Sequence, residues 1–150
     1  MKNILTESDY AEIRERIMAL SAKSPRQWGR MDLQQMLVHC TVQLKLAVGE
    51  MSSLRQGPSL LRSRLGKWIL FSNLPWPKGV TTPKEMNVET NDFLLAELET
   101  EKRELLNYLD KARGQEQLEP HPFFGNLNRE EWSRLIYKHL DHHLKQFGSH

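Results

Sequence analysis

Three of the six histidines lie close together near the C-terminal end, at His139, His142 and His143. An α-helix turns by about 100° per residue, so His139 and His143 project from one face, one turn apart. Both rings can therefore reach one cation at a metal–nitrogen distance of about 2.0–2.1 Å. This face also carries the apolar side chains Trp132, Leu135, Ile136 and Phe147, whereas His142 falls toward its polar edge. Because polar rings on an apolar face need partners, the pair indicates either a divalent-metal site or hydrogen-bonded core histidines.

A two-histidine pair supplies too few ligands for a stable transition-metal site, so a third ligand is needed. His39 is the natural candidate, because it lies in the middle of a predicted helix beside Met36 and Gln43 and flanks the apolar stripe. With His39, two helices would bring three neutral nitrogens to one point. The alternative is a hydrogen-bonded histidine at the boundary of the core.

Other residues near these histidines have weaker claims. Asp141 and Gln146 adjoin the pair and are candidates for orienting the imidazoles, although a surface position suits Asp141 equally well. His121 lies between two prolines, in a loop that either seats the following phenylalanines on the core or borders the mouth of the site. Cys40 is better interpreted as a small core residue than as a catalytic partner of His39, since adjacent helical positions diverge by 100°. No phosphate-binding loop, zinc-protease motif or nucleophile elbow is present.

Four stretches with helical periodicity must position these residues: 6–20, 32–48, 91–114 and a stretch that opens at residues 127–132. Thr6 with Asp9 resembles a capping box, Asp32 is a candidate N-cap, and Asn128 is followed by an acid at the third helical position. About forty residues that contain several prolines separate the second helix from the third, too many for a simple turn. The pattern predicts an all-α fold, a four-helix bundle with a long crossover between helices 2 and 3.

The crossover itself contains a candidate short helix at residues 59–71. Its apolar side chains Leu61, Leu65, Trp68 and Ile69 align, which favours a crossover helix that packs on the bundle. The alternative is a surface that binds a membrane or a partner through its basic flank.

Length and charge limit the classes of function. The 150 residues predict a single domain over 1–150, and the net charge of +2 is that of an ordinary soluble surface. The balanced charge therefore predicts no nucleic-acid partner, and because no run of eighteen or more apolar residues occurs, we expect no membrane partner. The N-terminus turns acidic before any secretory signal could form, and the single cysteine excludes an internal disulfide, so a cytoplasmic location is expected.

The sequence resembles the DinB-like metal-binding bundles. The resemblance lies in the run Gln34-Gln35-Met36-Leu37-Val38-His39 and in the late His139 and His143 with a following Gln146. Residues 121–132 and 138–148 resemble an uncharacterised bacterial subfamily of that group. The resemblance implies a four-helix bundle with a metal held by His39, His139 and His143. Many members follow the last histidine with Arg-Gly-Gln, whereas this chain has Leu144-Lys145-Gln146, so a role for that arginine does not carry over.

Two functions follow as expectations. Three neutral imidazoles leave coordination positions open, as catalytic sites do, which suits a metal-dependent transferase or hydrolase acting on a small molecule with water or a thiol as nucleophile. Zinc and nickel are the leading candidates for the divalent ion, and iron or copper also fit. The alternative is a non-catalytic module in which the histidines are structural and the surface binds a protein. A homodimer suits either function.

Overall fold

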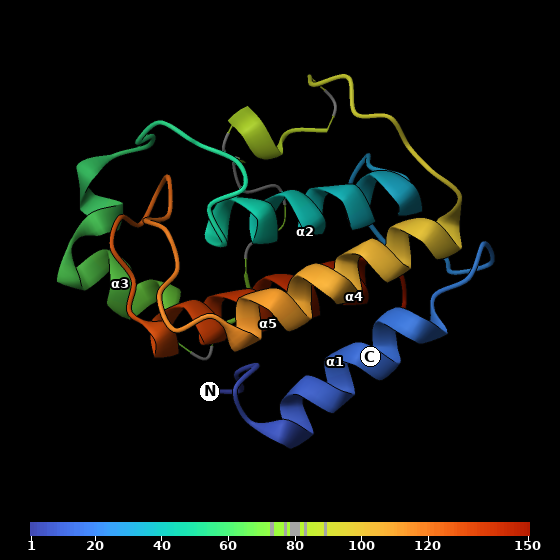
Figure 1. Cartoon of the computed structure of the whole chain (residues 1–150), viewed down its shortest axis with the longest axis horizontal. Helices are drawn as coiled ribbons and strands as arrows, with labels where there is room; N and C mark the ends of the chain where they lie inside the picture. Colours follow the sequence, from blue (N-terminus) through green and yellow to red (C-terminus); the bar gives the residue numbers. More distant parts are fainter. Residues whose placement is uncertain (73, 77, 79–81, 83, 89) are drawn as a thin grey trace.

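The chain folds into an all-helical bundle, seen in a computed structural model that describes residues 1–72, 74–76, 78, 82, 84–88 and 90–150 (Figure 1). The elements in chain order are α1 (Glu7–Ala19), α2 (Leu33–Ala47), the 3₁₀ turn η1 (Ser59–Arg62), α3 (Arg64–Leu70), the 3₁₀ turn η2 (Lys84–Met86), α4 (Leu98–Gly114) and α5 (Arg129–Gln146). The described residues form no β-strand, only an isolated bridge between His121 and Gly125. The predicted fold class, four long helices with a crossover between the second and the third, is confirmed.

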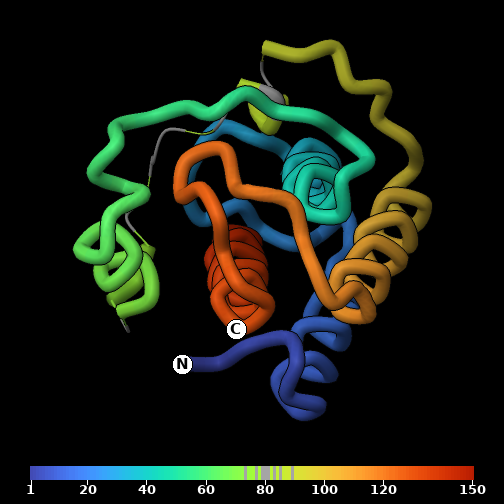
Figure 2. The backbone as a smooth tube through the Cα atoms, turned by 60° about the vertical axis from the view of Figure 1, so that its left-hand side comes forward, coloured from blue at the N-terminus to red at the C-terminus, as the bar shows by residue number. Residues whose placement is uncertain are grey.

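The helices surround α5. In Figure 2, α5 lies with α2 and α4 on one side and with α3 of the crossover on the other. The α3 side is fixed by Lys138 of α5, whose ammonium group donates to the carbonyl oxygens of Leu70 and Ser72 at 2.7 and 2.9 Å. No helix within the described ranges is long and apolar enough to cross a membrane.

Complete capping boxes open the two helices that carry the histidines. The Asp32 carboxylate accepts from the Gln35 backbone N–H, and the Gln35 side chain accepts from the Asp32 N–H. Asn128 and Glu131 form the same reciprocal pair at the start of α5. Each box satisfies backbone N–H groups that a helix start otherwise leaves without partners. Both predicted N-caps are confirmed.

Replacing Asn128 with alanine should lower the free energy of unfolding by about 1 kcal/mol, because the N-terminus of α5 then loses its side-chain acceptor. The loss should appear as a lower urea midpoint with an unchanged slope. Asn126→Ala is the matched control, since this exposed side chain lies just before the helix and caps nothing. Equal midpoints for the two variants would contradict the capping role.

The predicted capping box at Thr6 is wrong. Thr6 is the N-cap of α1, but its side chain makes no capping bond. Asn3 organises the turn instead, since its side-chain oxygen accepts from the N–H groups of Leu5 and Thr6 at 3.0 and 3.1 Å. Asp9 accepts from the Asn3 backbone N–H rather than from Thr6. An Asx-type turn at Asn3 therefore supplies the side-chain acceptor that was predicted at Thr6.

The third long helix begins later than predicted. Helix α4 starts at Leu98 rather than near residue 91, because the buried Glu101 carboxylate turns back and accepts from the Ala96 N–H at 2.7 Å. Leu94, an apolar residue inside the predicted range 91–114, lies before the helix and is 98% exposed. Leu105 and Leu109 are fully buried as expected. The bond from the Ala96 N–H to Glu101 therefore sets the start of α4, although the apolar spacing extends to residues before it.

Two apolar clusters hold the bundle together. The larger one joins all four long helices around side chains such as Ile17, Leu37, Leu109 and Ile136. The smaller one links one flank of α2 to the crossover through Val38, Val42, Leu46, Met86 and Val88. The smaller cluster matters for the site, because it fixes the backbone around Met86 against α2.

The predicted crossover helix is present, but its aligned apolar side chains face solvent instead of the bundle. Residues 59–71 form η1 and α3, yet Leu65, Trp68 and Ile69 are all more than half exposed. The inner side of α3 is made by Gly66 and Leu70. The prediction that these three side chains pack on the bundle is therefore wrong. Helix α3 packs through Gly66 instead, because this residue has no side chain and allows a close approach to η1.

Candidate metal centre

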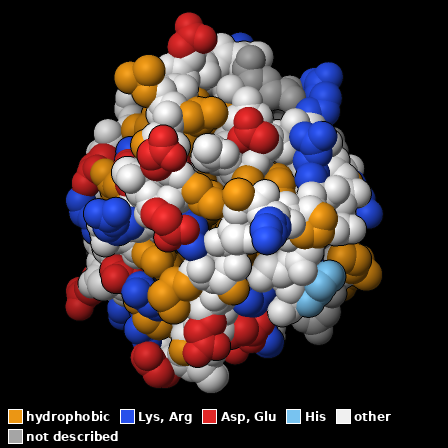
Figure 3. All heavy atoms as spheres, turned by 90° about the vertical axis from the view of Figure 1, so that its right-hand side faces the viewer, with side chains coloured by type: hydrophobic (Ala, Val, Ile, Leu, Met, Phe, Trp, Pro, Cys, Tyr) orange, Lys and Arg blue, Asp and Glu red, His pale blue; other side chains and the backbone are white. Residues whose placement is uncertain are grey.

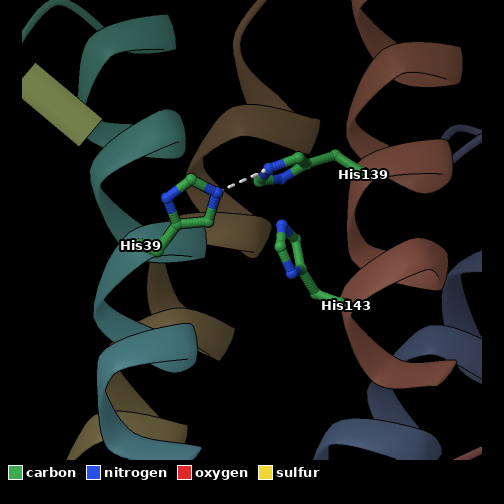
Figure 4. Close-up of side chains that lie close together, drawn as sticks. All are labelled: His39, His139 and His143. Atoms are coloured by element: carbon green, nitrogen blue, oxygen red, sulfur yellow. Dashed lines mark hydrogen bonds between the residues drawn. The ribbon is translucent and has the colours of Figure 1, made fainter. Parts of the chain in front are cut away.

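The three predicted histidines meet between α2 and α5. His39 projects from the middle of α2, and His139 and His143 project from α5 toward it (Figure 4). All three are buried, with exposed fractions of 4, 6 and 8%. Among the described residues they form a cluster of metal-ligating type with one nitrogen from each residue, and no carboxylate belongs to it.

The spacing of the nitrogens suits a single cation. The candidate ligand atoms all lie within 4.8 Å of one another, and the Nε2 atoms of His39 and His139 are 3.0 Å apart. Two tetrahedral ligands at about 2.1 Å from a shared ion are about 3.4 Å apart. The observed nitrogens therefore need only small side-chain adjustments to bind one ion.

Hydrogen bonds hold two of the rings in the tautomer that binds metal through Nε2. The carbonyl oxygen of Met86 can only accept, so His39 Nδ1, at 2.8 Å, carries the proton and donates it. His143 Nδ1 donates to the side-chain oxygen of Gln146 at 2.8 Å. Nε2 of each ring is left with a bare lone pair, as a metal ligand requires.

The Gln146 amide is itself fixed in one orientation. Its Nε2 donates to the Trp28 carbonyl oxygen at 2.9 Å, so its oxygen must face His143. The loop can approach this closely because of Gly29, which has φ of 79° and where a Cβ atom would lie 2.5 Å from Gln146 Nε2. The expectation that Gln146 orients an imidazole is confirmed.

His139 is the ring whose hydrogen bonds do not balance. Its Nδ1 is buried without a hydrogen-bond partner, and its Nε2 faces the bare Nε2 of His39. Only a proton or a cation between the two Nε2 atoms makes that contact favourable. Because Nε2 of His143 is bare as well, a proton on His139 Nε2 can pair with only one of the two lone pairs, whereas one cation can accept a lone pair from each of the three rings. The residues present therefore fit a divalent cation.

Burial keeps the cluster neutral at physiological pH. It lowers the pKa of His39 and His139 below the ordinary value of 6.5 and lowers that of His143 to about 3. For His139, the neighbouring His143 adds to this effect by charge repulsion. Neutral imidazoles are the form that binds metal, so no proton has to be displaced near pH 7.

Aromatic rings and His142 form the border of the cluster. The ring of Trp76 lies 5.7 Å from that of His139 and 6.2 Å from that of His142, and Trp28 lies 5.7 Å from His142. His142 is half-buried, as its predicted place at the polar edge implies, and its ring is 5.1 Å from that of His143. These apolar rings limit the access of water on this side.

The remaining candidates have structural roles. Asp141 accepts from Arg16 and Lys145 at 2.8 Å each, so the structure gives it ionic partners rather than an imidazole to orient. His121 Nδ1 accepts from the N–H groups of Phe123 and Phe124, which supports the turn-forming interpretation of its loop. Cys40 is fully buried, its thiol pKa is raised by burial, and it is a core residue as predicted.

The sequence did not point to three contributors to the site. The Met86 carbonyl is a backbone atom and has no residue signature, while Trp28 and Trp76 lie in irregular segments without periodicity. The prolines around Trp76 marked only a loop. Spacing along the chain reveals ligands on helices but does not reveal what a loop brings against them.

The fold and the cluster together define a helical bundle with a buried three-histidine centre of metal-binding type. The chain belongs to the family described as protein of unknown function (DUF1569), whose model matches residues 2–150. No curated protein and no solved structure matches the chain significantly. Membership of the DinB-like superfamily is an expectation from the sequence resemblance and is a separate question from this family match.

Proposed function

We propose that this protein binds one divalent ion through His39, His139 and His143 and uses it to transform a small molecule. The observation that carries the proposal is the convergence of bare nitrogens on one point. His39 and His143 are held with bare Nε2 atoms, Nε2 of His139 lies 3.0 Å from that of His39, and the candidate ligand atoms of all three rings lie within 4.8 Å of one another. In a purely structural network, a proton on His139 Nε2 would pair with only one of these lone pairs, whereas one cation accepts from all three rings.

The donor set favours a catalytic site over a closed structural one. Three neutral imidazoles neither fill a tetrahedral shell nor neutralise a divalent charge, so a position remains for an exogenous ligand. Such an ion supplies Lewis acidity and lowers the pKa of a water or thiol bound to it. Zinc and nickel are the ions we propose first. A transferase that uses a small thiol, or a hydrolase, is the corresponding reaction class.

Residues around the cluster fix the orientation of the ligand rings and line the space beside them. Met86 and Gln146 fix the planes of two ligand rings, and Trp76 covers the edge of the third. Since Met86 belongs to the crossover, ligand geometry depends on how the crossover packs against α2. The alternative, a non-catalytic module, would use the same two hydrogen bonds but gives no purpose to two bare Nε2 lone pairs that meet at one point.

Cobalt substitution tests the proposal that the site is open. Cobalt(II) bound to the wild-type protein should show visible absorption bands, and a small thiol should shift them and add a sulfur-to-metal charge-transfer band. A spectrum that no small thiol changes would exclude thiol chemistry. If water-exchange relaxation of the same sample also shows no inner-sphere water, the open site is refuted and the structural module is favoured.

Replacing Gln146 with alanine should weaken metal binding by about 10–100-fold, because His143 loses the acceptor that fixes its ring and tautomer. Competition with a metal chelator of known affinity measures the change. Lys145→Ala is the matched control, since this neighbouring side chain is exposed and forms its ion pair with Asp141, away from the cluster. An affinity equal to that of the wild type would show that the Gln146 bond is incidental.

A further inference from the structure

The crossover between α2 and α4 exposes large apolar side chains that the bundle leaves uncovered. These residues, here called the α3 patch, are Leu54, Leu60, Leu65, Trp68, Ile69 and Leu74, with exposed fractions of 81, 59, 55, 70, 53 and 66%. The other large apolar side chains that are exposed among the described residues lie scattered, at Met1, Met18, Leu94 and Leu95. Several large apolar side chains exposed on one segment, three of them on a single helix face, mark an interaction surface.

The centre of the α3 patch is a firmly held helix face. At 100° per residue, Leu65, Trp68 and Ile69 share an arc of about 100° on α3. A Cβ atom on Gly66 would lie 2.4 Å from the Leu60 carbonyl oxygen, so α3 fits tightly against η1. The Lys67 ammonium group donates to the Asn126 carbonyl oxygen at 2.6 Å and ties α3 to the start of α5. Helix α3 lies at one end of the molecule (Figure 1), and its apolar arc faces solvent.

The segment that carries the α3 patch has cations and no acids. Residues 51–84 contain Arg55, Arg62, Arg64, Lys67, Lys78 and Lys84, with no Asp or Glu. Arg55 and Arg64 are exposed and make no ion pair or hydrogen bond within the described part of the chain. The face on the opposite side of the molecule, shown in Figure 3, instead mixes basic and acidic side chains. The near-neutral net charge of the chain thus conceals a segment whose charged side chains are all basic.

We propose that the α3 patch docks on the surface of an anionic phospholipid bilayer. Leucine, isoleucine and tryptophan on one helix face, flanked by unpaired arginines, are the composition of helices that lie in the membrane interface. The arginines would meet the lipid phosphates, and Trp68 would sit at the level of the headgroups. This binding needs no membrane-spanning helix and does not depend on the metal site.

Two other occupants fit the same observations less well. A second copy joined through the α3 patch would place unpaired arginines against arginines, which costs affinity. A nucleic acid would satisfy the arginines but would leave Leu65 and Ile69 against a polar backbone, since aliphatic side chains do not stack on bases as aromatic ones do. The inference departs from the expectation of no membrane partner, which rested on the absence of a membrane-spanning apolar run and on the interpretation of the crossover helix as packed on the bundle.

Vesicle co-sedimentation tests the proposal with the full-length protein. Vesicles of phosphatidylcholine with phosphatidylglycerol should bind it, and vesicles of phosphatidylcholine alone should bind it weakly. Arg64→Gln should lower the partition coefficient about fivefold. The double variant Leu65→Ala, Trp68→Ala should lower it by about tenfold or more. Both variants alter exposed side chains, and far-ultraviolet circular dichroism confirms that they fold.

Matched controls remove the same side-chain types elsewhere on the surface. Arg103→Gln and Leu94→Ala replace an exposed cation and an exposed leucine outside the α3 patch and should leave binding unchanged. Absence of binding to anionic vesicles, or equal losses in the control variants, would overturn the proposal. So would concentration-dependent dimerisation that the double variant abolishes while vesicle binding is absent, since a second copy would then cover the α3 patch.

Discussion

Replacing His139 with alanine is expected to abolish stoichiometric metal binding. His139 faces the Nε2 of His39 at 3.0 Å and shares a helix face with His143, so its loss leaves two ligands on different helices. Two histidines do not make a stable transition-metal site, and the affinity should fall by more than about 100-fold, beyond the effect of losing an orienting group. Elemental analysis of protein purified without nickel affinity resin measures the metal content directly.

The control for His139→Ala is His142→Ala. His142 is half-buried and borders the cluster but does not belong to it, so this variant should retain the full metal content. Metal should also raise the wild type's stability by about 2.7 kcal/mol when the free ion is at 100 times its dissociation constant, with no such gain for His139→Ala. A wild-type protein that binds no zinc, nickel, cobalt, iron or copper would refute the metal centre.

Acidification from pH 7 to pH 4 should destabilise the metal-free protein by several kcal/mol. Burial lowers the pKa of both His121 and His143 to about 3, whereas an unfolded histidine titrates near 6.5. Between these values the unfolded chain binds more protons than the folded one, so stability rises with pH in this window. The contribution of these two histidines to the free energy of unfolding is complete above about pH 6.5 and is lost as the pH falls toward 3. By pH 4 the loss should be about 3 kcal/mol for each of the two residues.

The variant His121→Asn isolates one of these contributions. An asparagine side chain can accept the Phe123 and Phe124 N–H groups that His121 Nδ1 accepts now, so the turn should persist. Between pH 4 and 5.5, the free energy of unfolding of this variant, measured with urea, should fall with acid less steeply than that of the wild type. The difference between the two slopes should be about 1.4 kcal/mol per pH unit. Above pH 7.5 the two proteins should show parallel pH dependence. An unchanged slope between pH 4 and 5.5 would mean that His121 is protonated in the folded protein.

The helices and the two ligands on α5 were predictable because their signals are local. His139 and His143 are separated by one helical turn, so their common direction follows from helix geometry once α5 forms. Asn128 and Glu131 define the start of that helix through bonds between residues three apart. The boundary of α4 was mispredicted because its capping group, Glu101, is also part of the apparent periodic stretch.

The sequence by itself determined an all-helical bundle and two imidazoles on one buried helix face, since both depend on interactions within a few residues. Only the tertiary structure decided that His39 meets them, because the relative position of α2 and α5 depends on packing between distant segments. It also decided that Met86 and Gln146 hold the rings and that Trp68 faces solvent. Periodicity shows which residues share a face, but only the packed neighbours decide whether that face meets the core, a metal ion or an outside surface.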